Sequence, residues 1–297
     1  MELRQLRYFA EAAESLNFTD ASKALFISQS TLSQQIKQLE NELGVSLFDR
    51  IGKRVYLTEV GVEFLAHAKK TLQAAESGKQ KIMDLQNLKT GILKIGVTYT
   101  LSILLADALV KFSKKYPFIK LEIVSNNSEE LFELLNNHKI DMMLSFNNTC
   151  IVSNIISRPL FNSSLSVIVH ANHPFCSLKS ISFSMLDSIP LILLSKGFTA
   201  RRKLDEILKK KNIEVSPVME LNDVHILLQL VNKGNWATIL SNSTAVGHNE
   251  LKAIPLQDKE CNLTASLYIL EGTYISNSMK AFEETLLNMP LPESLEK

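Results

Sequence analysis

Residues 27–50, ISQSTLSQQIKQLENELGVSLFDR, decide how the N-terminal part of this 297-residue chain folds. Apolar residues recur there every three or four positions, which is the spacing of one stripe on an α-helix: Leu32, Ile36, Leu39 and Leu43. Ser28 stands where an N-cap hydroxyl accepts a hydrogen bond from a free backbone N–H group, and Gly44 stands where a left-handed residue ends a helix. The segment therefore predicts one helix between these two residues.

The opposite face of this helix is polar. At about 100° per residue, the side chains that cluster there are Ser30, Ser33, Gln34 and Lys37. Short or flexible hydrogen-bonding groups of this kind suit contacts with base edges and phosphates. For an isolated helix, a solvated surface face is the more common explanation. The neighbouring segments have to decide between the two interpretations.

Those segments predict a winged helix-turn-helix. Residues 3–16 carry a helical apolar face, and Thr19 is the expected N-cap of a second short helix that contains Ala21, Ala24 and Leu25. Residues 26–28 then form a tight connection to the polar helix, which is the arrangement of a DNA-binding helix-turn-helix. Downstream, LFDR and RVYLT flank Ile51-Gly52-Lys53 and alternate like strands. They predict a β-hairpin wing with three cations near its tip: Arg50, Lys53 and Arg54.

The stretch FTDASKALFISQSTLSQQIKQLENELGVSLFDR, followed by LTEVG, is similar to the N-terminal module of LysR-type transcriptional regulators. The similarity is dense over about residues 1–60, and weaker similarity follows in the expected order. It implies a helix-turn-helix near residues 18–37 and DNA contacts from Gln29, Ser30, Ser33 and Gln34. Many members have Arg in place of Gln34 and Pro in place of Ser30. This departure changes the expected base preference, because Arg pairs with guanine whereas Gln favours adenine.

The charge of the N-terminal part argues against DNA binding at first sight. Residues 1–60 hold seven Lys/Arg and eight Asp/Glu, whereas a nucleic-acid domain is usually basic. The cations, however, lie on the turn, the polar helix and the predicted wing: Lys23, Lys37, Arg50, Lys53 and Arg54. We therefore expect double-stranded DNA as the partner, with modest affinity per domain that dimerisation increases.

A long helix is predicted after the wing, from the N-cap Thr58 to about Leu88. Its apolar residues alternate by three and four positions, which is the spacing of a coiled-coil seam: Leu65, Ala68, Leu72, Ala75 and Ile82. A core helix of the next domain is the alternative interpretation. We expect a linker helix that pairs two chains over part of its length, which the resemblance also implies.

Residues 91–297 carry 20 Lys/Arg and 20 Asp/Glu and alternate strand-like and helix-like segments. Such alternation predicts an α/β fold with parallel sheets. Two sets of segments are joined near residues 158–162 and again near residues 262–265. The arrangement resembles the two-lobed, periplasmic-binding-protein-like effector domain of the LysR family. The expected division is 1–58 for the winged helix-turn-helix, 59–89 for the linker helix and 90–297 for the effector domain, with lobe I at about 90–160 and 266–297 and lobe II at about 161–265.

Sheets of this kind bind ligands beyond the carboxyl ends of their strands. Hydroxyl groups and helix N-termini at such positions suit a small anion or a hydroxyl-rich metabolite. The candidate effector-binding residues are Thr98, Tyr99, Thr100, Ser102, Phe146, Phe198, Thr199 and Asn222. Ordinary helix capping by the threonines is an equally common explanation for each segment alone.

Composition limits the remaining classes. We expect no enzyme activity and no cofactor, because there is no GxSxG, no P-loop and no GxGxxG after a strand. His170 and His173 lie in a Pro-containing loop, so we expect no metal site there. Three scattered cysteines without a CxxC, and an N-terminus that enters an acidic amphipathic helix directly, indicate reduced thiols in the cytoplasm and no signal peptide. No apolar stretch is long enough to span a membrane.

Two functions of different class fit this sequence. The first is a LysR-type transcription regulator that binds DNA as a homodimer or homotetramer and responds to a small-molecule effector, with RNA polymerase as a further partner. The second is a solute-binding or enzymatic α/β protein with an incidental helical N-terminus. The predicted wing and linker helix favour the regulator, because a solute-binding protein needs neither.

Overall fold

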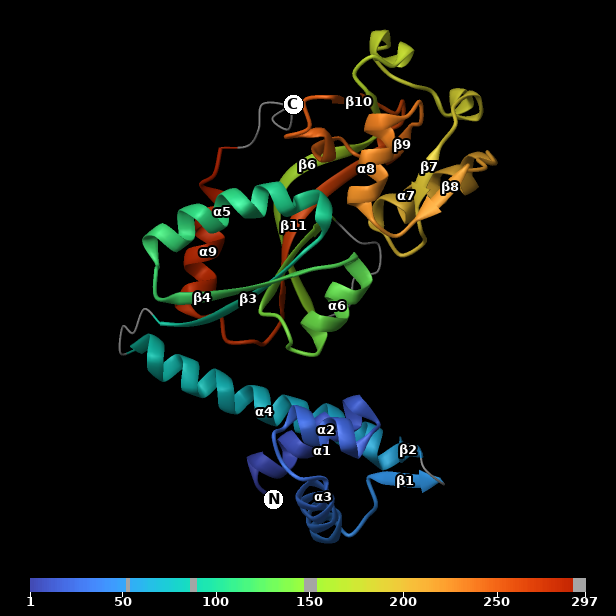
Figure 1. The fold of residues 1–297 in the computed structure, drawn as a ribbon. Coiled ribbons are helices and arrows are strands. Elements are labelled where there is room, and N and C mark those ends of the chain that lie inside the picture. The colour runs from blue at the N-terminus through green and yellow to red at the C-terminus, as the bar shows by residue number, and fades with distance from the viewer. Residues whose placement is uncertain (52–53, 86–89, 147–153, 291–297) are drawn as a thin grey trace. The chain divides into compact units, whose positions relative to one another are not determined.

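The protein divides into two compact units, residues 1–87 and 88–297, in a computed structural model (Figure 1). The structure describes residues 1–51, 54–85, 90–146 and 154–290, with the backbone alone at residues 50, 51 and 54. The fold confirms an N-terminal winged helix-turn-helix followed by a two-lobed α/β domain.

The N-terminal unit consists of four helices and a hairpin: α1 (Leu3–Ser15), α2 (Phe18–Ala24), α3 (Gln29–Leu43), β1 (Phe48–Ile51), β2 (Arg54–Leu57) and α4 (Glu59–Leu85). The predicted stripe of α3 is buried at Leu32, Ile36 and Leu39 and packs against α1 and α2. Phe9 of α1 is fully buried at the centre, where its ring contacts those of Phe48 and Phe64.

The predicted ends of α3 are confirmed. The Ser28 hydroxyl accepts a hydrogen bond from the Thr31 N–H group at 3.1 Å, and Gly44 takes a left-handed conformation with φ of +73°. The predicted start of α2 is wrong, because Asn17, not Thr19, is its N-cap. The Asn17 amide oxygen accepts from the N–H groups of Thr19 and Asp20, so Thr19 lies inside the helix.

The predicted wing is an antiparallel pair in which Ile51 lies opposite Arg54 and Phe48 opposite Leu57. A two-residue connection, residues 52 and 53, joins the strands and lies outside the described residues. The predicted cations Lys53 and the side chains of Arg50 and Arg54 therefore lie outside the described part of the structure. The backbone nevertheless places positions 50 and 54 at the end of the hairpin next to this connection.

Helix α4 packs its first half against its own unit. Thr58 caps the helix as predicted, because its hydroxyl accepts from the Gly61 N–H group at 2.9 Å. Ala68 is only 1% exposed and Leu65 and Leu72 pack against the same core. This corrects the predicted seam, because Ala68 is covered by its own chain and cannot face a second copy. Ala75, Ile82 and Leu85 are exposed, and Ala75 and Ile82 continue the heptad spacing on the second half of the helix.

The larger unit begins with a sheet that has helices packed against both faces. Its elements are β3 (Gly91–Val97), α5 (Ser102–Lys115), β4 (Ile119–Ser125), α6 (Ser128–Asn136), β5 (Met142–Phe146), β11 (Asn262–Leu270) and α9 (Asn277–Leu287). Helices α5 and α9 lie side by side, with Phe112 against Phe282 (Figure 1). The alternate residues of β5 contact different clusters, so that Met142 joins the α5 and α9 side and Met143 joins the α6 side.

The second part of this unit is built on the continuation of β6 (Ile155–His170). Its other elements are β7 (Ile192–Leu194), α7 (Thr199–Lys211), β8 (Met219–Leu221), α8 (Val224–Lys233), β9 (Thr238–Ser241) and β10 (Leu251–Pro255). Strand β6 pairs with β11 along its first half and with β9 and β10 along its second half.

The expected parallel sheets are in fact mixed. The pairs β3–β4, β3–β5 and β7–β8 are parallel, whereas every pair that β6 or β11 makes is antiparallel. The reason is that β6 and β11 cross between the two sets of strands in opposite directions. The sequence patterns at residues 155–164 and 251–255 did not predict strands, and both segments are strands in the structure.

Phe26 has a strained backbone conformation in the turn of the helix-turn-helix. Its φ is +55° and its side chain is 95% exposed, so no burial offsets the left-handed conformation. We expect Phe26→Asn to raise the free energy of unfolding by about 0.5–1 kcal/mol, because Asn adopts this conformation more easily. Urea unfolding measures the change. Phe26→Val, which places a branched β-carbon at positive φ, should lower the same quantity, and equal stabilities for the two variants would contradict the strain.

Candidate nucleic-acid interface and effector cavity

The outer face of α3 carries the predicted DNA-reading residues. Gln29, Ser30, Gln34 and Lys37 are exposed and Ser33 is half-buried, while the opposite stripe is held in the core. The polar face is held in a fixed position, because Leu32, Ile36 and Leu39 of the same helix are buried in the core. The structure brings all five predicted residues of the helix onto one surface.

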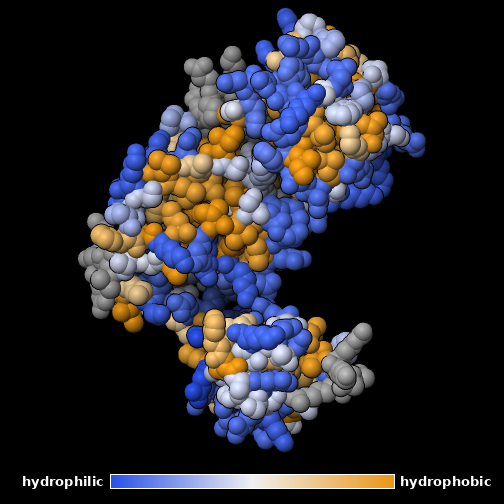
Figure 2. All heavy atoms as spheres, viewed as in Figure 1, coloured by the Kyte–Doolittle hydropathy of each residue, from blue (hydrophilic) through white to orange (hydrophobic). Residues whose placement is uncertain are grey.

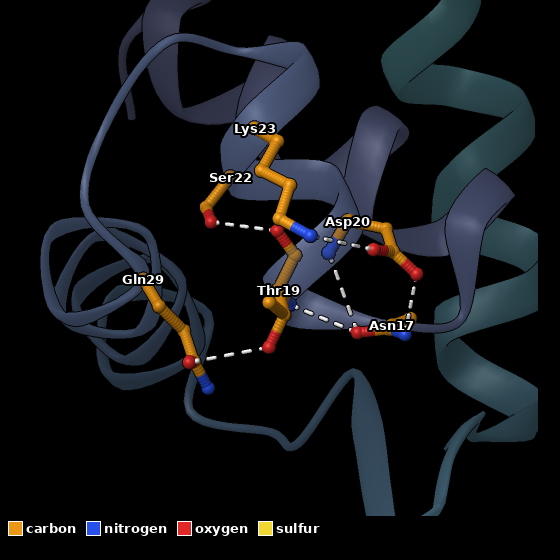
Figure 3. A network of polar contacts seen from close by, with 6 residues as sticks. All are labelled: Asn17, Thr19, Asp20, Ser22, Lys23 and Gln29. Atoms are coloured by element: carbon orange, nitrogen blue, oxygen red, sulfur yellow. Dashed lines mark hydrogen bonds and ion pairs between the residues drawn. The ribbon is translucent and has the colours of Figure 1, made fainter.

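Polar contacts organise the start of this face. The Ser28 hydroxyl lies 2.8 Å from that of Ser30, and the Thr19 hydroxyl of α2 donates to the Gln29 amide oxygen at 3.3 Å (Figure 3). Thr19 was not among the predicted site residues. Its position in the first turn of α2 was the available signal, because the first helix of this motif crosses the DNA backbone.

The larger unit contains a cavity of about 410 Å³, open solvent at its mouth included. It lies beyond the carboxyl ends of five strands, β3, β4, β5, β7 and β9, as the rule for such sheets predicts. Six of the eight predicted effector residues line it: Thr98, Tyr99, Thr100, Phe146, Phe198 and Thr199. Ser102 and Asn222 are not among its lining residues.

Eight further residues line the cavity: Asn126, Asn127, Ser128, Leu194, Ala200, Val224, Leu240 and Ser241. Asn126, Asn127 and Ser128 directly follow β4, so the rule that found residues 98–100 would have found them as well. Leu240 and Ser241 end β9. Nothing in the local pattern separates these two residues from an ordinary buried strand, because their neighbours come from distant parts of the chain.

The cavity has an uncharged lining, and the positive end of a helix dipole faces it. None of the described residues that line the cavity is charged. Thr199 and Ala200 open α7, whose N-terminus has no side-chain cap, so its first N–H groups can meet a ligand. Burial, and then the Asp223 carboxylate, raise the pKa of the Tyr99 phenol, which therefore stays protonated at neutral pH. The site offers hydrogen-bond donors and the positive end of a helix dipole.

Hydroxyl groups bridge the two sets of strands beside the cavity. Ser128 of α6 lies 2.5 Å from the Thr199 hydroxyl of α7 and 2.9 Å from the Ser145 hydroxyl of β5, measured between oxygen atoms. Glu129 and Arg202 form an ion pair at 3.1 Å between the same two helices. A ligand that uses Thr199 therefore acts where the two parts of the unit already touch.

The two loop histidines that were considered as metal ligands form local hydrogen bonds instead. The Nδ1 atoms of His170 and His173 accept hydrogen bonds from the N–H groups of Asn172 and Phe175, respectively. Among the described residues no group of three His, Cys, Asp or Glu side chains could hold a metal ion.

No helix in the described part of the chain has the length and apolar character that crossing a membrane requires. Cys150 lies outside the described residues, and Cys176 and Cys261 are free thiols.

Cys261 should be unreactive at neutral pH. Burial in the core, followed by the Asp258 carboxylate, raises the pKa of its thiol to about 11. At pH 7 roughly one molecule in ten thousand then carries the reactive thiolate. We expect slow alkylation by iodoacetamide, with a rate that rises about tenfold per pH unit below that pKa, as long as the protein stays folded. Mass spectrometry of the peptide measures it, with urea-unfolded protein as the control. Equal rates for Cys261 and the half-buried Cys176 would contradict the prediction.

The geometry defines a helix-turn-helix DNA-binding unit followed by an α/β unit with a ligand-sized cavity. Comparison with known families agrees: the bacterial regulatory helix-turn-helix family of the lysR type matches residues 3–62, and the LysR substrate binding domain matches residues 86–290. The chain belongs to the LysR family of transcriptional regulators.

Individual relatives span most of the chain. The transcriptional dual regulator GltC of Bacillus subtilis is 33% identical over 82% of each chain. A full-length OxyR variant from Pseudomonas aeruginosa has a TM-score of 0.75 at 24% identity, and the match covers 99% of this chain and 96% of OxyR. Full-length CbnR in complex with its target DNA has a TM-score of 0.63 at 23% identity, over 96% of this chain and 99% of CbnR. The two structures show the shared fold.

Proposed function

We propose that this LysR-type regulator reads the major groove of duplex DNA with the outer face of α3 and contacts phosphates with its wing. The observation that carries the proposal is the polar face of α3, whose reading residues are exposed while its opposite stripe is fixed in the core. Gln29, Ser30, Ser33 and Gln34 face the bases, and Lys37, Arg50, Lys53 and Arg54 add positive charge at the edges of the contact.

Gln34→Ala should relax the preference at one base pair by about 1–3 kcal/mol, because Gln34 is exposed on the reading face. Binding assays on a set of single-base operator variants measure the effect. The matched control is Lys53→Ala, which should weaken all sequences alike and flatten the salt dependence, because a phosphate contact carries no sequence information. Unchanged relative affinities among the variants for Gln34→Ala would remove Gln34 from the reading face.

We infer that the effector is a small anion or a hydroxyl-rich metabolite held in the cavity between the lobes. Support comes from the neutral donors of Thr98, Thr100 and Thr199, the phenol of Tyr99 and the uncapped N-terminus of α7. Such donors stabilise negative charge without a cationic side chain. The effector must bind one arrangement of the lobes better than the other, because a ligand with equal affinity for both shifts nothing.

Two surfaces support self-association into a homodimer or homotetramer. The first is the exposed second half of α4, where Ala75 and Ile82 follow heptad spacing. The second is α5, over which apolar side chains gather on the face drawn in Figure 2, with Ile103 and Val110 exposed there. Leu65 and Leu72 contribute less than the sequence suggests, because they already pack within the chain.

The proposed division keeps 1–58 as the winged helix-turn-helix, 59–89 as the linker helix and 90–297 as the effector domain, with the lobes at about 90–160 plus 266–297 and at about 161–265. Helix α4 belongs to the same compact unit as the helix-turn-helix. Its N-terminal half accordingly acts as part of the DNA-binding module and its C-terminal half as the dimerisation segment. A DNA-binding regulator works in the cytoplasm, where RNA polymerase is a further proposed partner. A footprint on the DNA that flanks its own gene tests the assignment.

A further inference from the structure

Gln29, the first residue of α3, is held in one orientation by a residue of the preceding helix. The Thr19 hydroxyl donates to the Gln29 amide oxygen at 3.3 Å. Figure 3 shows the amide oxygen directed at Thr19 and the amide nitrogen directed away from it. The oxygen of Gln29 thus faces α2, and its two N–H donors face outward.

The hydroxyl group that holds Gln29 is itself rigidly placed. The Thr19 N–H group donates to the Asn17 side chain at 2.9 Å, and the Thr19 carbonyl accepts from the buried Ser22 hydroxyl at 2.8 Å (Figure 3). Threonine also has a branched β-carbon, which restricts χ1. Asn17, Thr19 and Ser22 therefore form a fixed support behind the Gln29 amide.

The Gln29 side chain borders open space. A surface hollow of about 870 Å³, open solvent included, lies between the start of α2, the start of α3 and the wing strand β2. Its lining residues are Leu16, Asn17, Phe18, Thr19, Gln29, Val55 and Tyr56. A nucleotide strand that runs past α3 has access to the outward N–H groups from this side.

The orientation limits what Gln29 can recognise. A free glutamine pairs with adenine through both ends, because its oxygen accepts from N6 and its nitrogen donates to N7. With the oxygen turned to Thr19, both atoms cannot face the same base edge. We propose that Thr19 makes Gln29 a donor-only reader, which favours guanine, whose O6 and N7 both accept, over adenine, which offers N7 alone and carries a donor at N6. The inference rests on the proposed entry of α3 into the major groove, and Thr19 is a positioning residue in it.

The test compares Thr19→Val, which keeps the shape but loses the hydroxyl, with Thr19→Ser, which keeps the hydroxyl. Full-length protein selects duplexes from a random-sequence pool, and the base pair that Gln29 meets is the one whose preference Gln29→Ala removes. In Thr19→Val the preference for adenine at that pair should rise about tenfold, which corresponds to about 1.4 kcal/mol. Thr19→Ser should keep the preference of the unmodified protein. Thr19→Ala, which also lacks the hydroxyl, replaces Thr19→Val should the latter fail to fold.

A double-mutant cycle separates orientation from structural damage. Lysine has donors only, so in a Gln29→Lys background Thr19→Val should leave the base preference unchanged. An unchanged preference in Thr19→Val and Thr19→Ala, at a base pair that Gln29→Ala does alter, would overturn the inference and leave the regulator assignment intact. A uniform loss of affinity in Gln29→Ala would overturn it as well. Failure of the proposed function would be seen differently, as an unmodified protein that selects no sequence from the pool.

Discussion

Phe9→Ala should lower the free energy of unfolding of the N-terminal unit by about 3–5 kcal/mol and abolish operator binding with it. The Phe9 ring is fully buried, with centroid distances of 5.5 Å to Phe48 and 5.2 Å to Phe64. It therefore joins α1 to the wing and to α4, and its removal leaves a cavity at the point where three elements meet. Small domains are stable by only about 5–15 kcal/mol, so the loss is a large fraction of the total.

The control for this prediction is Phe26→Ala in the same unit. Phe26 is 95% exposed, so the same change of residue type removes almost no buried surface and should not lower stability. Urea unfolding followed by circular dichroism gives the stabilities, and a gel-shift titration gives the operator affinity. Similar losses of stability in the two variants would contradict the assignment of Phe9 to the centre of the core.

Thr100→Ala combined with Thr199→Ala should weaken effector binding about 100-fold or more. Both residues line the cavity, and a hydrogen bond to a charged group contributes about 1.5–3 kcal/mol. Two such bonds therefore account for about 3–6 kcal/mol. Operator binding without effector should stay unchanged, because neither residue belongs to the N-terminal unit.

Calorimetry on the full-length protein with sulfate, thiosulfate, cyanate and small carboxylates measures this effect. Ser102→Ala is a matched control, because Ser102 carries the same kind of hydroxyl on the same segment but does not line the cavity. Tight binding of a bulky neutral aromatic molecule that the double variant leaves undisturbed would exclude the small-anion hypothesis.

Local patterns were sufficient to predict much of the DNA-binding unit. The buried stripe, the Ser28 cap and the Gly44 end of α3 depend on residues within a few positions of one another, so the sequence carries the information directly. The hairpin follows from alternation on either side of a short connection. The start of α2 was misplaced by two residues, because both Asn17 and Thr19 are good capping residues and only the backbone geometry decides which side chain reaches the free N–H groups.

The sequence by itself determined the helix-turn-helix and the residues at the ends of β3 and β5, because each depends on short-range periodicity. Only the tertiary structure decided which partner covers an apolar stripe. Heptad spacing at Ala68 and at Ile82 is the same pattern, yet Ala68 is buried by its own chain and Ile82 is 59% exposed. Likewise, only the tertiary structure placed Thr98 and Ser241 in the lining of one cavity. Paired strands such as β6 and β11 bring together residues that are about a hundred positions apart in the sequence. No local sequence pattern records which strands will pair, so this cavity could not be predicted in full.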